Sequence, residues 1–185
     1  MESAKKMNIV TLTVNPAVDK STVIDRLIPE QKLRCDPPRF DAGGGGINVS
    51  KAIKRLGGKS LAIFTAGGLS GQLLADLVKQ EQIDAKIIET EEWTRENFVV
   101  AETSTNAQYR FGMPGAALNE AETLAILEAL EQSKADYIVA SGSLPPKMDN
   151  NFYEKVASIA KKTGSRLILD TSGEPLKAAC DEGVF

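Results

Sequence analysis

Short runs of apolar residues alternate with stretches of helical periodicity along most of the chain. The runs are rich in β-branched side chains and mostly end at Gly, Asn, Ser or Asp, which is typical of buried strands. They are residues 7–14, 60–66, 85–88, 137–140 and 166–169. The helical stretches are residues 47–56, 70–82, 119 onward and 151–162. This alternation predicts an α/β fold, in which helices cover both faces of a mostly parallel sheet.

The helix that begins at residue 119 has two local signals. Asn119 followed by Glu122 is the pattern of an N-terminal cap with an acidic residue three positions on. Three leucines, at positions 124, 127 and 130, are spaced to form one apolar face. We therefore expect a capped helix whose leucine face packs on the sheet.

Residues 21–40 and 97–113 do not fit the alternation, because they contain extended pieces with no helix between them and their neighbours. Prolines interrupt the first segment, as expected of edge or hairpin strands, and its piece 32–35 (KLRC) is predicted as a short strand. The polar turn 103–106 in the second segment is a hairpin signal. We predict a small separate sheet that projects from the α/β body.

The amino-acid composition excludes several kinds of catalytic and metal site. The chain has 185 residues, 42% of them hydrophobic and 25% charged, which is ordinary for a soluble globular protein. It contains no histidine, so a Ser-His-Asp nucleophile and a histidine-ligated metal site are excluded. Its two cysteines, Cys35 and Cys180, lie far apart in the sequence and match no metal-binding pattern. Acid–base chemistry must therefore use carboxylates, Lys or Tyr.

Charge and hydropathy bear on partners and location. A net charge of −3 argues against a broad surface for nucleic acid or anionic lipid. The longest uncharged stretch, residues 60–75, is shorter than a membrane span. The first six residues show no secretory signal. We expect a cytoplasmic protein that binds no nucleic acid and no membrane, and any anion it binds should be small.

Three polar turns follow predicted strands, where ligands gather in open α/β sheets. Residues 43–46 are four glycines, which allow main-chain N–H groups to approach a ligand at the following helix N-terminus or form only a flexible turn. Asp19 follows the first strand and can accept hydrogen bonds from sugar hydroxyls or cap a turn. The hydroxyl groups of residues 141–146 line the same edge or make a turn.

Several of these segments resemble a known family. They are residues 29–35 (PEQKLRC), 43–50 (GGGGINVS), 93–95 (WTR), 108–111 (QYRF), 113–120 (MPGAALNE) and 141–146 (SGSLPP). They resemble the ribokinase-like carbohydrate kinases, in particular the phosphofructokinase B branch and its minor bacterial 6-phosphofructokinases. The resemblance covers nearly the whole chain. It implies a three-layer α/β/α body with a small projecting β-sheet lid, formed by strands at about 21–40 and 97–113.

The resemblance also implies roles for individual residues. The sugar site would consist of Asp19, Gly43, Gly44, Gly45, Gly46 and Asn48. Arg95 and Ser143 would bind a 6-phosphate, with Arg110 as a weaker candidate, because a guanidinium and hydroxyl donors suit a dianion. Lys32 would reach the nucleotide of the neighbouring subunit in a homodimer clasped through the lid. Without the family, Lys32 is equally well an exposed strand lysine.

The implied reaction is transfer of a phosphoryl group from ATP, with Mg²⁺, to fructose 6-phosphate, giving fructose 1,6-bisphosphate. The alternatives are a tagatose-6-phosphate or fructose-1-phosphate kinase, and a noncatalytic sugar-phosphate-binding or dimerisation module.

The end of the chain bears on catalysis. The family's GAGD motif, which holds its catalytic aspartate, and its KPN motif do not occur here, and we expect the catalytic base to lie beyond Phe185. Residues 1–185 therefore resemble the N-terminal part of a single domain without its nucleotide-binding part. Val184 and Phe185 look like the start of another strand. We expect no catalytic residue in this chain and no turnover by it alone.

Overall fold

The computed structural model describes residues 7–182 and has a five-stranded parallel sheet at its centre. Its strands are β1 (Ile9–Thr13), β4 (Leu61–Ala66), β5 (Asp84–Glu89), β8 (Tyr137–Ser141) and β9 (Arg166–Asp170), in the order β5-β4-β1-β8-β9. Strand β1 is central, and each of its neighbours lies far from it in the sequence. The predicted parallel sheet is confirmed.

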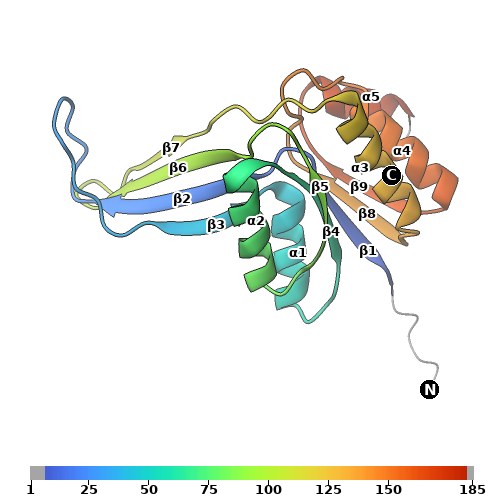
Figure 1. The fold of residues 1–185 in the computed structure, drawn as a ribbon, viewed down its shortest axis with the longest axis horizontal. Helices are drawn as coiled ribbons and strands as arrows, with labels where there is room; N and C mark the ends of the chain where they lie inside the picture. The colour runs from blue at the N-terminus through green and yellow to red at the C-terminus, as the bar shows by residue number, and fades with distance from the viewer. Residues whose placement is uncertain (1–6, 183–185) are drawn as a thin grey trace.

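Helices cover both faces of this sheet (Figure 1). One face carries α1 (Gly45–Arg55) and α2 (Gly68–Gln80), and the other carries α3 (Glu120–Gln132), α4 (Phe152–Thr163) and α5 (Glu174–Glu182). Strand β1 alternates between them: Val10 and Leu12 pack in the core with α3 and α4, whereas the hydroxyl of Thr11 meets Ser50 of α1. The three-layer body is confirmed.

The end of the described chain differs from the sequence expectation. The sequence pattern did not predict α5, which follows β9 and packs against α4. The strand expected to start at Val184 and Phe185 lies outside the described residues, which end at Glu182. The expectation that the catalytic base lies beyond Phe185 concerns the same end of the chain, and it stays a prediction.

Helix α3 confirms one local prediction and corrects another. Asn119 accepts a hydrogen bond from the Glu122 main chain, and the Glu122 carboxylate accepts one from the Asn119 main chain, so the capping box is present. The expected leucine face is only partly right: Leu130 is buried and Leu127 packs against the core, but Leu124 is half exposed. The buried residues of the helix are Glu122, Ile126 and Leu130. A spacing of four residues keeps 122, 126 and 130 on one side of the helix, whereas a spacing of three drifts away from it.

A second, four-stranded sheet extends sideways from the body (Figure 1). Its strands are β2 (Ala17–Ile24), β3 (Arg39–Gly43), β6 (Arg95–Glu102) and β7 (Gln108–Phe111), in the order β3-β2-β6-β7. We call it the small sheet. Strands β2 and β6 are parallel, and the outer pairs are antiparallel. The predicted separate sheet is confirmed, although its strands β2 and β6 begin before residues 21 and 97, at the edge of the body.

The segment between β2 and β3, residues 25–38, forms no strand. The prediction of a strand at 32–35 is therefore wrong. The segment lies at the end of the small sheet farthest from the body (Figure 1), and it is attached there by Thr22, whose hydroxyl donates to the Asp36 carbonyl at 2.7 Å. Prolines flank residues 32–35, and a proline has no N–H with which to join a sheet.

Among residues 7–182, no helix is long and apolar enough to cross a membrane.

Glu102 fastens this segment to the small sheet. It is 4% exposed, and its carboxylate accepts hydrogen bonds from the Thr105 hydroxyl (2.8 Å), the Leu27 main chain (3.1 Å) and the Tyr109 hydroxyl (3.2 Å). The hydrogen bond from Thr105 is the main cause that holds the pKa of Glu102 below its ordinary value of 4.5. The ionised carboxylate therefore contributes to the fold.

We expect the replacement Glu102→Gln to lower the melting temperature at neutral pH. A pKa that is lower in the folded state means that the stabilisation is present above the unfolded pKa and is lost as the pH falls through the folded pKa. The difference between wild type and variant should accordingly shrink below about pH 4. Thermal unfolding at a series of pH values measures it, and a difference independent of pH would contradict a role for the charge.

Candidate functional site

The candidate site lies where the carboxyl ends of β1 and β8 meet the base of the small sheet. The chain leaves β1 through Asn15 and enters β2 at Ala17, so the turn between them joins the two sheets. Strand β3 returns to the body through the glycine run, residues 43–46, which leads into α1. The three turns that the sequence singled out therefore converge on one edge of the parallel sheet, as expected for a ligand site in an α/β fold.

Close packing explains the glycine run. A Cβ atom on Gly43 would overlap the carboxylate of Asp19, and one on Gly45 would overlap Ser141. The run thus packs closely against β2 and β8, and larger residues would displace the Asp19 side chain and clash with Ser141. This contact brings Asp19 and Ser141 together. Asp19 lies within β2 and Ser141 at the end of β8, so the prediction that Asp19 lies in a turn is wrong. Residues 43–46 form the end of β3 and the start of α1, and their role in ligand binding stays a prediction.

The same run sets the start of α1. Gly44 has φ +128, a backbone conformation that residues with a Cβ rarely adopt. The side chain of Thr13, at the end of β1, accepts a hydrogen bond of 3.0 Å from the Ile47 N–H. The N-terminus of α1, with its partial positive charge, is therefore held at the site. Asn48 lies in its first turn and is exposed.

Asp19 has a polar residue beside it on each neighbouring strand of the small sheet. It lies level with Asp41 on β3 and Asn97 on β6. The Asn97 amide donates to Asp19 Oδ1 at 2.9 Å and, through its own oxygen, accepts the Met113 N–H at 3.1 Å. Within the described part of the chain, no donor contacts Asp19 Oδ2. One carboxylate oxygen is thus fixed by the protein, and the other is available to a ligand.

Sequence reasoning missed Asn97, because nothing in its local pattern distinguishes it from other strand residues. We expect Asn97→Asp to lower the free energy of unfolding by about 1–3 kcal/mol, since a carboxylate cannot donate to Asp19 and repels it. Asn150→Asp is the matched control at an exposed position and should change it by less than about 0.5 kcal/mol. Urea unfolding compares the two, and equal effects would mean that the Asn97 contact contributes nothing.

Arg95 connects segments at the base of the small sheet through hydrogen bonds. Its guanidinium donates to the main-chain carbonyls of Asn15 (2.9 Å), Met113 (3.2 Å) and Pro16 (3.3 Å). Burial lowers the pKa of Arg95, and the nearby charge of Asp19 opposes this shift. A guanidinium has five N–H groups and remains charged in proteins, so two of them are left to bind an anion.

Ser143 reaches the same place from the other sheet. Its hydroxyl accepts a hydrogen bond of 3.1 Å from the Asn15 amide. Two hydrogen bonds hold the start of the loop that carries Ser143. The Tyr153 hydroxyl donates to the Gly142 carbonyl at 2.8 Å, and the Ser141 hydroxyl donates to the Asp170 carboxylate at 2.8 Å. Burial raises the pKa of Tyr153, which keeps its hydroxyl a donor. The loop is therefore rigidly placed.

Two predicted residues lie farther out. Arg110 is on β7, next to Val99 in register, and therefore on the same face of the small sheet as Asp19. Its guanidinium donates to Gln108 at 2.9 Å and is exposed. Lys32 lies in the 25–38 segment at the far end of the small sheet and is also exposed. The structure thus brings Asp19, Arg95 and Ser143 together and leaves Lys32 apart from them.

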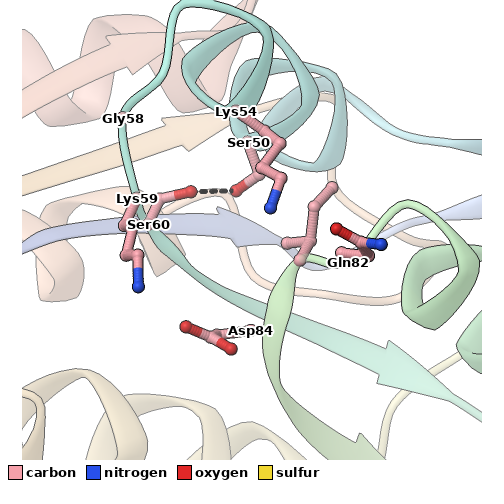
Figure 2. Close-up of a pocket in the computed structure, with 8 residues that line it drawn as sticks. Ser50, Lys54, Gly58, Lys59, Ser60, Gln82 and Asp84 are labelled. Carbon is pink, nitrogen blue, oxygen red and sulfur yellow. Dashed lines mark hydrogen bonds between the residues drawn. The ribbon is translucent and has the colours of Figure 1, made fainter.

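Figure 2 shows a different pocket, of about 150 Å³, lined by Ser50, Lys54, Gly58, Lys59, Ser60, Gln82, Ile83 and Asp84. Its walls come from the end of α1 and the beginnings of β4 and β5. Parallel strands begin at one edge of a sheet and end at the other, so this pocket lies opposite the edge where Asp19 and Arg95 gather. It does not belong to the candidate site.

Comparisons with known proteins point to one family. The sequence pattern described as pfkB family carbohydrate kinase matches residues 8–184. The ATP-dependent 6-phosphofructokinase isozyme 2 of Mycobacterium tuberculosis is 44% identical over 182 residues, which are 97% of this chain and 53% of that protein. The Escherichia coli protein of the same name is 45% identical over 174 residues, 94% of this chain and 56% of that protein.

The fold agrees with these sequences. The crystal structure of phosphofructokinase-2 from Escherichia coli in complex with fructose-6-phosphate matches with a TM-score of 0.89 and 44% identity, over 96% of this chain and 59% of that chain. The expected ribokinase-like fold is therefore confirmed. The chain spans about half the length of the relatives that it matches. Since the family pattern covers nearly all of its residues, the chain belongs to the pfkB family of carbohydrate kinases.

Proposed function

We propose that the complete protein is a kinase that transfers the γ-phosphoryl group of ATP to the 1-hydroxyl of fructose 6-phosphate, the committed step of glycolysis. The observation that supports this best is the position of Arg95 and Ser143, which flank Asn15 at the edge of the sheet where Asp19 also lies. A guanidinium and a hydroxyl beside a carboxylate suit a sugar that carries a phosphate. The reaction uses metabolites of the cytoplasm, where we expect the protein.

In this proposal residues 7–182 bind the acceptor sugar. Asp19 Oδ2 accepts hydrogen bonds from sugar hydroxyls, while the glycine run and Asn48 line the sugar. The bond formed joins sugar oxygen O1 to the γ-phosphorus, and the bond broken joins that phosphorus to the β,γ-bridging oxygen. The hydroxyl proton passes to a base that we place beyond Phe185, in the part of the family that this chain does not span. The site contributes to the reaction by positioning the sugar and by electrostatic stabilisation.

The family implies Mg²⁺ with the nucleotide. The residues that the structure describes contain no cluster of three or more acidic, cysteine or histidine side chains that would hold a metal ion. We therefore assign no step to a metal in this part of the chain. Where ATP and Mg²⁺ bind is a property of the complete protein.

The test is an assay of the full-length protein with ATP and four acceptors: fructose 6-phosphate, tagatose 6-phosphate, fructose 1-phosphate and fructose. The proposal requires the highest kcat/KM for fructose 6-phosphate. A preference for another phosphosugar would establish the rival kinases instead. Residues 1–185 alone should form no ADP above background, and a full-length protein that binds the sugar without turnover would favour the noncatalytic module.

We further propose that two copies pair through their small sheets. The outer part of that sheet has no helix on it in Figure 1, and Phe111 and Tyr109 of its edge strand are 46% and 41% exposed. An edge strand with exposed aromatic residues is a surface that a second copy can cover. The 25–38 segment of one copy would then approach the nucleotide of the other.

This arrangement gives Lys32 a testable role. In the full-length protein, Lys32→Ala should raise KM for ATP several-fold and leave KM for the sugar nearly unchanged, because an ammonium group that contacts a phosphate is lost. Lys134→Ala, at an exposed position on the body, is the matched control. Steady-state kinetics and sedimentation measure both claims, and a fully active monomer would contradict the pairing.

A further inference from the structure

Asn15 occupies the turn between the two sheets and contacts both. It is 9% exposed. Its amide nitrogen donates to Ser143 Oγ at 3.1 Å and to the Leu144 carbonyl at 3.3 Å, while its main-chain carbonyl accepts from Arg95. A carbonyl can only accept, so the Leu144 contact requires that the nitrogen, and not the oxygen, of the Asn15 amide faces this loop.

This orientation determines what Ser143 can do. A serine hydroxyl has one hydrogen to donate and lone pairs that accept. Because the hydroxyl oxygen accepts from Asn15, its own hydrogen is free for another acceptor, and a phosphate oxygen is such an acceptor. On the other side of the turn, the Asn15 carbonyl occupies one N–H of Arg95 and so orients the remaining guanidinium donors.

We propose that Asn15 is a positioning residue for phosphate recognition, which holds the Ser143 hydroxyl as a donor and Arg95 at a fixed place beside it. The inference rests on the proposed function and deepens it, since it says why this site would prefer a phosphorylated sugar. It predicts different effects for two replacements of Asn15. A carboxylate at position 15 has the shape of the amide but accepts the Ser143 hydrogen and repels the phosphate, whereas an alanine only releases Ser143.

The experiment measures kcat and KM of the full-length protein with fructose 6-phosphate and with fructose for wild type, Asn15→Asp and Asn15→Ala. We expect Asn15→Asp to lower kcat/KM for fructose 6-phosphate by at least about tenfold, mainly through KM, and Asn15→Ala to lower it less. The value for fructose should change by less than about twofold. Asn150→Ala is the matched control, and thermal unfolding checks that each variant folds.

A double-variant cycle tests whether Asn15 acts through Ser143. In the Ser143→Ala background, Asn15→Ala should cause little further loss, because the group that it positions is already absent. Equal losses for both substrates, or fully additive losses, would overturn the inference and leave the kinase assignment intact. A wild-type protein that does not use fructose 6-phosphate would overturn the proposed function, and this inference with it. Should Asn15→Asp fail to fold, the double-variant cycle with Asn15→Ala still tests the inference, because fully additive losses would overturn it.

Discussion

Replacing Arg95 with alanine in the full-length protein should lower kcat/KM for fructose 6-phosphate by at least about tenfold. Hydrogen bonds to charged groups contribute about 1.5–3 kcal/mol each, and a phosphate would accept the two N–H groups that the carbonyls of Asn15, Pro16 and Met113 leave free. Unphosphorylated fructose should lose much less. Arg95→Lys should not restore the activity, because an ammonium cannot donate to three carbonyls and also bind phosphate from two sides.

The matched control is Arg166→Ala. Arg166 is an exposed arginine at the beginning of β9, at the edge of the sheet opposite the site. Kinetics with both sugars separate the two possible roles of Arg95. A loss restricted to the phosphorylated sugar supports the phosphate contact, whereas an equal loss for both would assign Arg95 to the structure of the small sheet. Arg110, on the same face as Asp19, would then be the next candidate for the phosphate.

Replacing Asp19 with asparagine should lower activity with both sugars, unlike the replacement of Arg95. The change preserves an oxygen that accepts the Asn97 hydrogen bond, so the fold should remain intact. It removes a charged acceptor from the sugar hydroxyls, and kcat/KM should fall by about tenfold to a hundredfold for fructose 6-phosphate and fructose alike. Steady-state kinetics with both substrates measure this, and circular dichroism checks the fold.

Asp41→Asn is a close control for this experiment. Asp41 lies directly beside Asp19 in the sheet register, but it pairs with Arg39 at 2.7 Å on an exposed edge. An exposed ion pair contributes little, so its loss should change kcat/KM only slightly. Similar losses for both aspartates would mean that the kinetics report the net charge of the small sheet and not a contact with the sugar.

Much of the fold could be predicted because burial follows the chain locally. The apolar runs and helical periods located the strands of the parallel sheet, three strands of the small sheet and four of the five helices, but not β3. The capping residues Asn119 and Glu122 marked the start of α3. The prediction failed where burial depends on a partner. Residues 32–35 have a strand-like composition but no neighbouring strand with which to pair, and Leu124 stays half exposed because the buried side of α3 carries Ile126 and Leu130.

The sequence by itself determined the sheet, most of the small sheet beside it and the polar segments that follow strands, since each of these follows from residue types that are close together in the chain. The tertiary structure alone decided how the site works. Asn97 meets Asp19 across 78 positions, and Arg95 meets the Asn15 carbonyl across 80. Such contacts depend on the register between distant strands and on the direction of main-chain carbonyls, which no local pattern of side chains encodes. For that reason the family resemblance could name Arg95, Asp19 and Ser143, but only the fold shows that Asn15 connects Arg95 with Ser143.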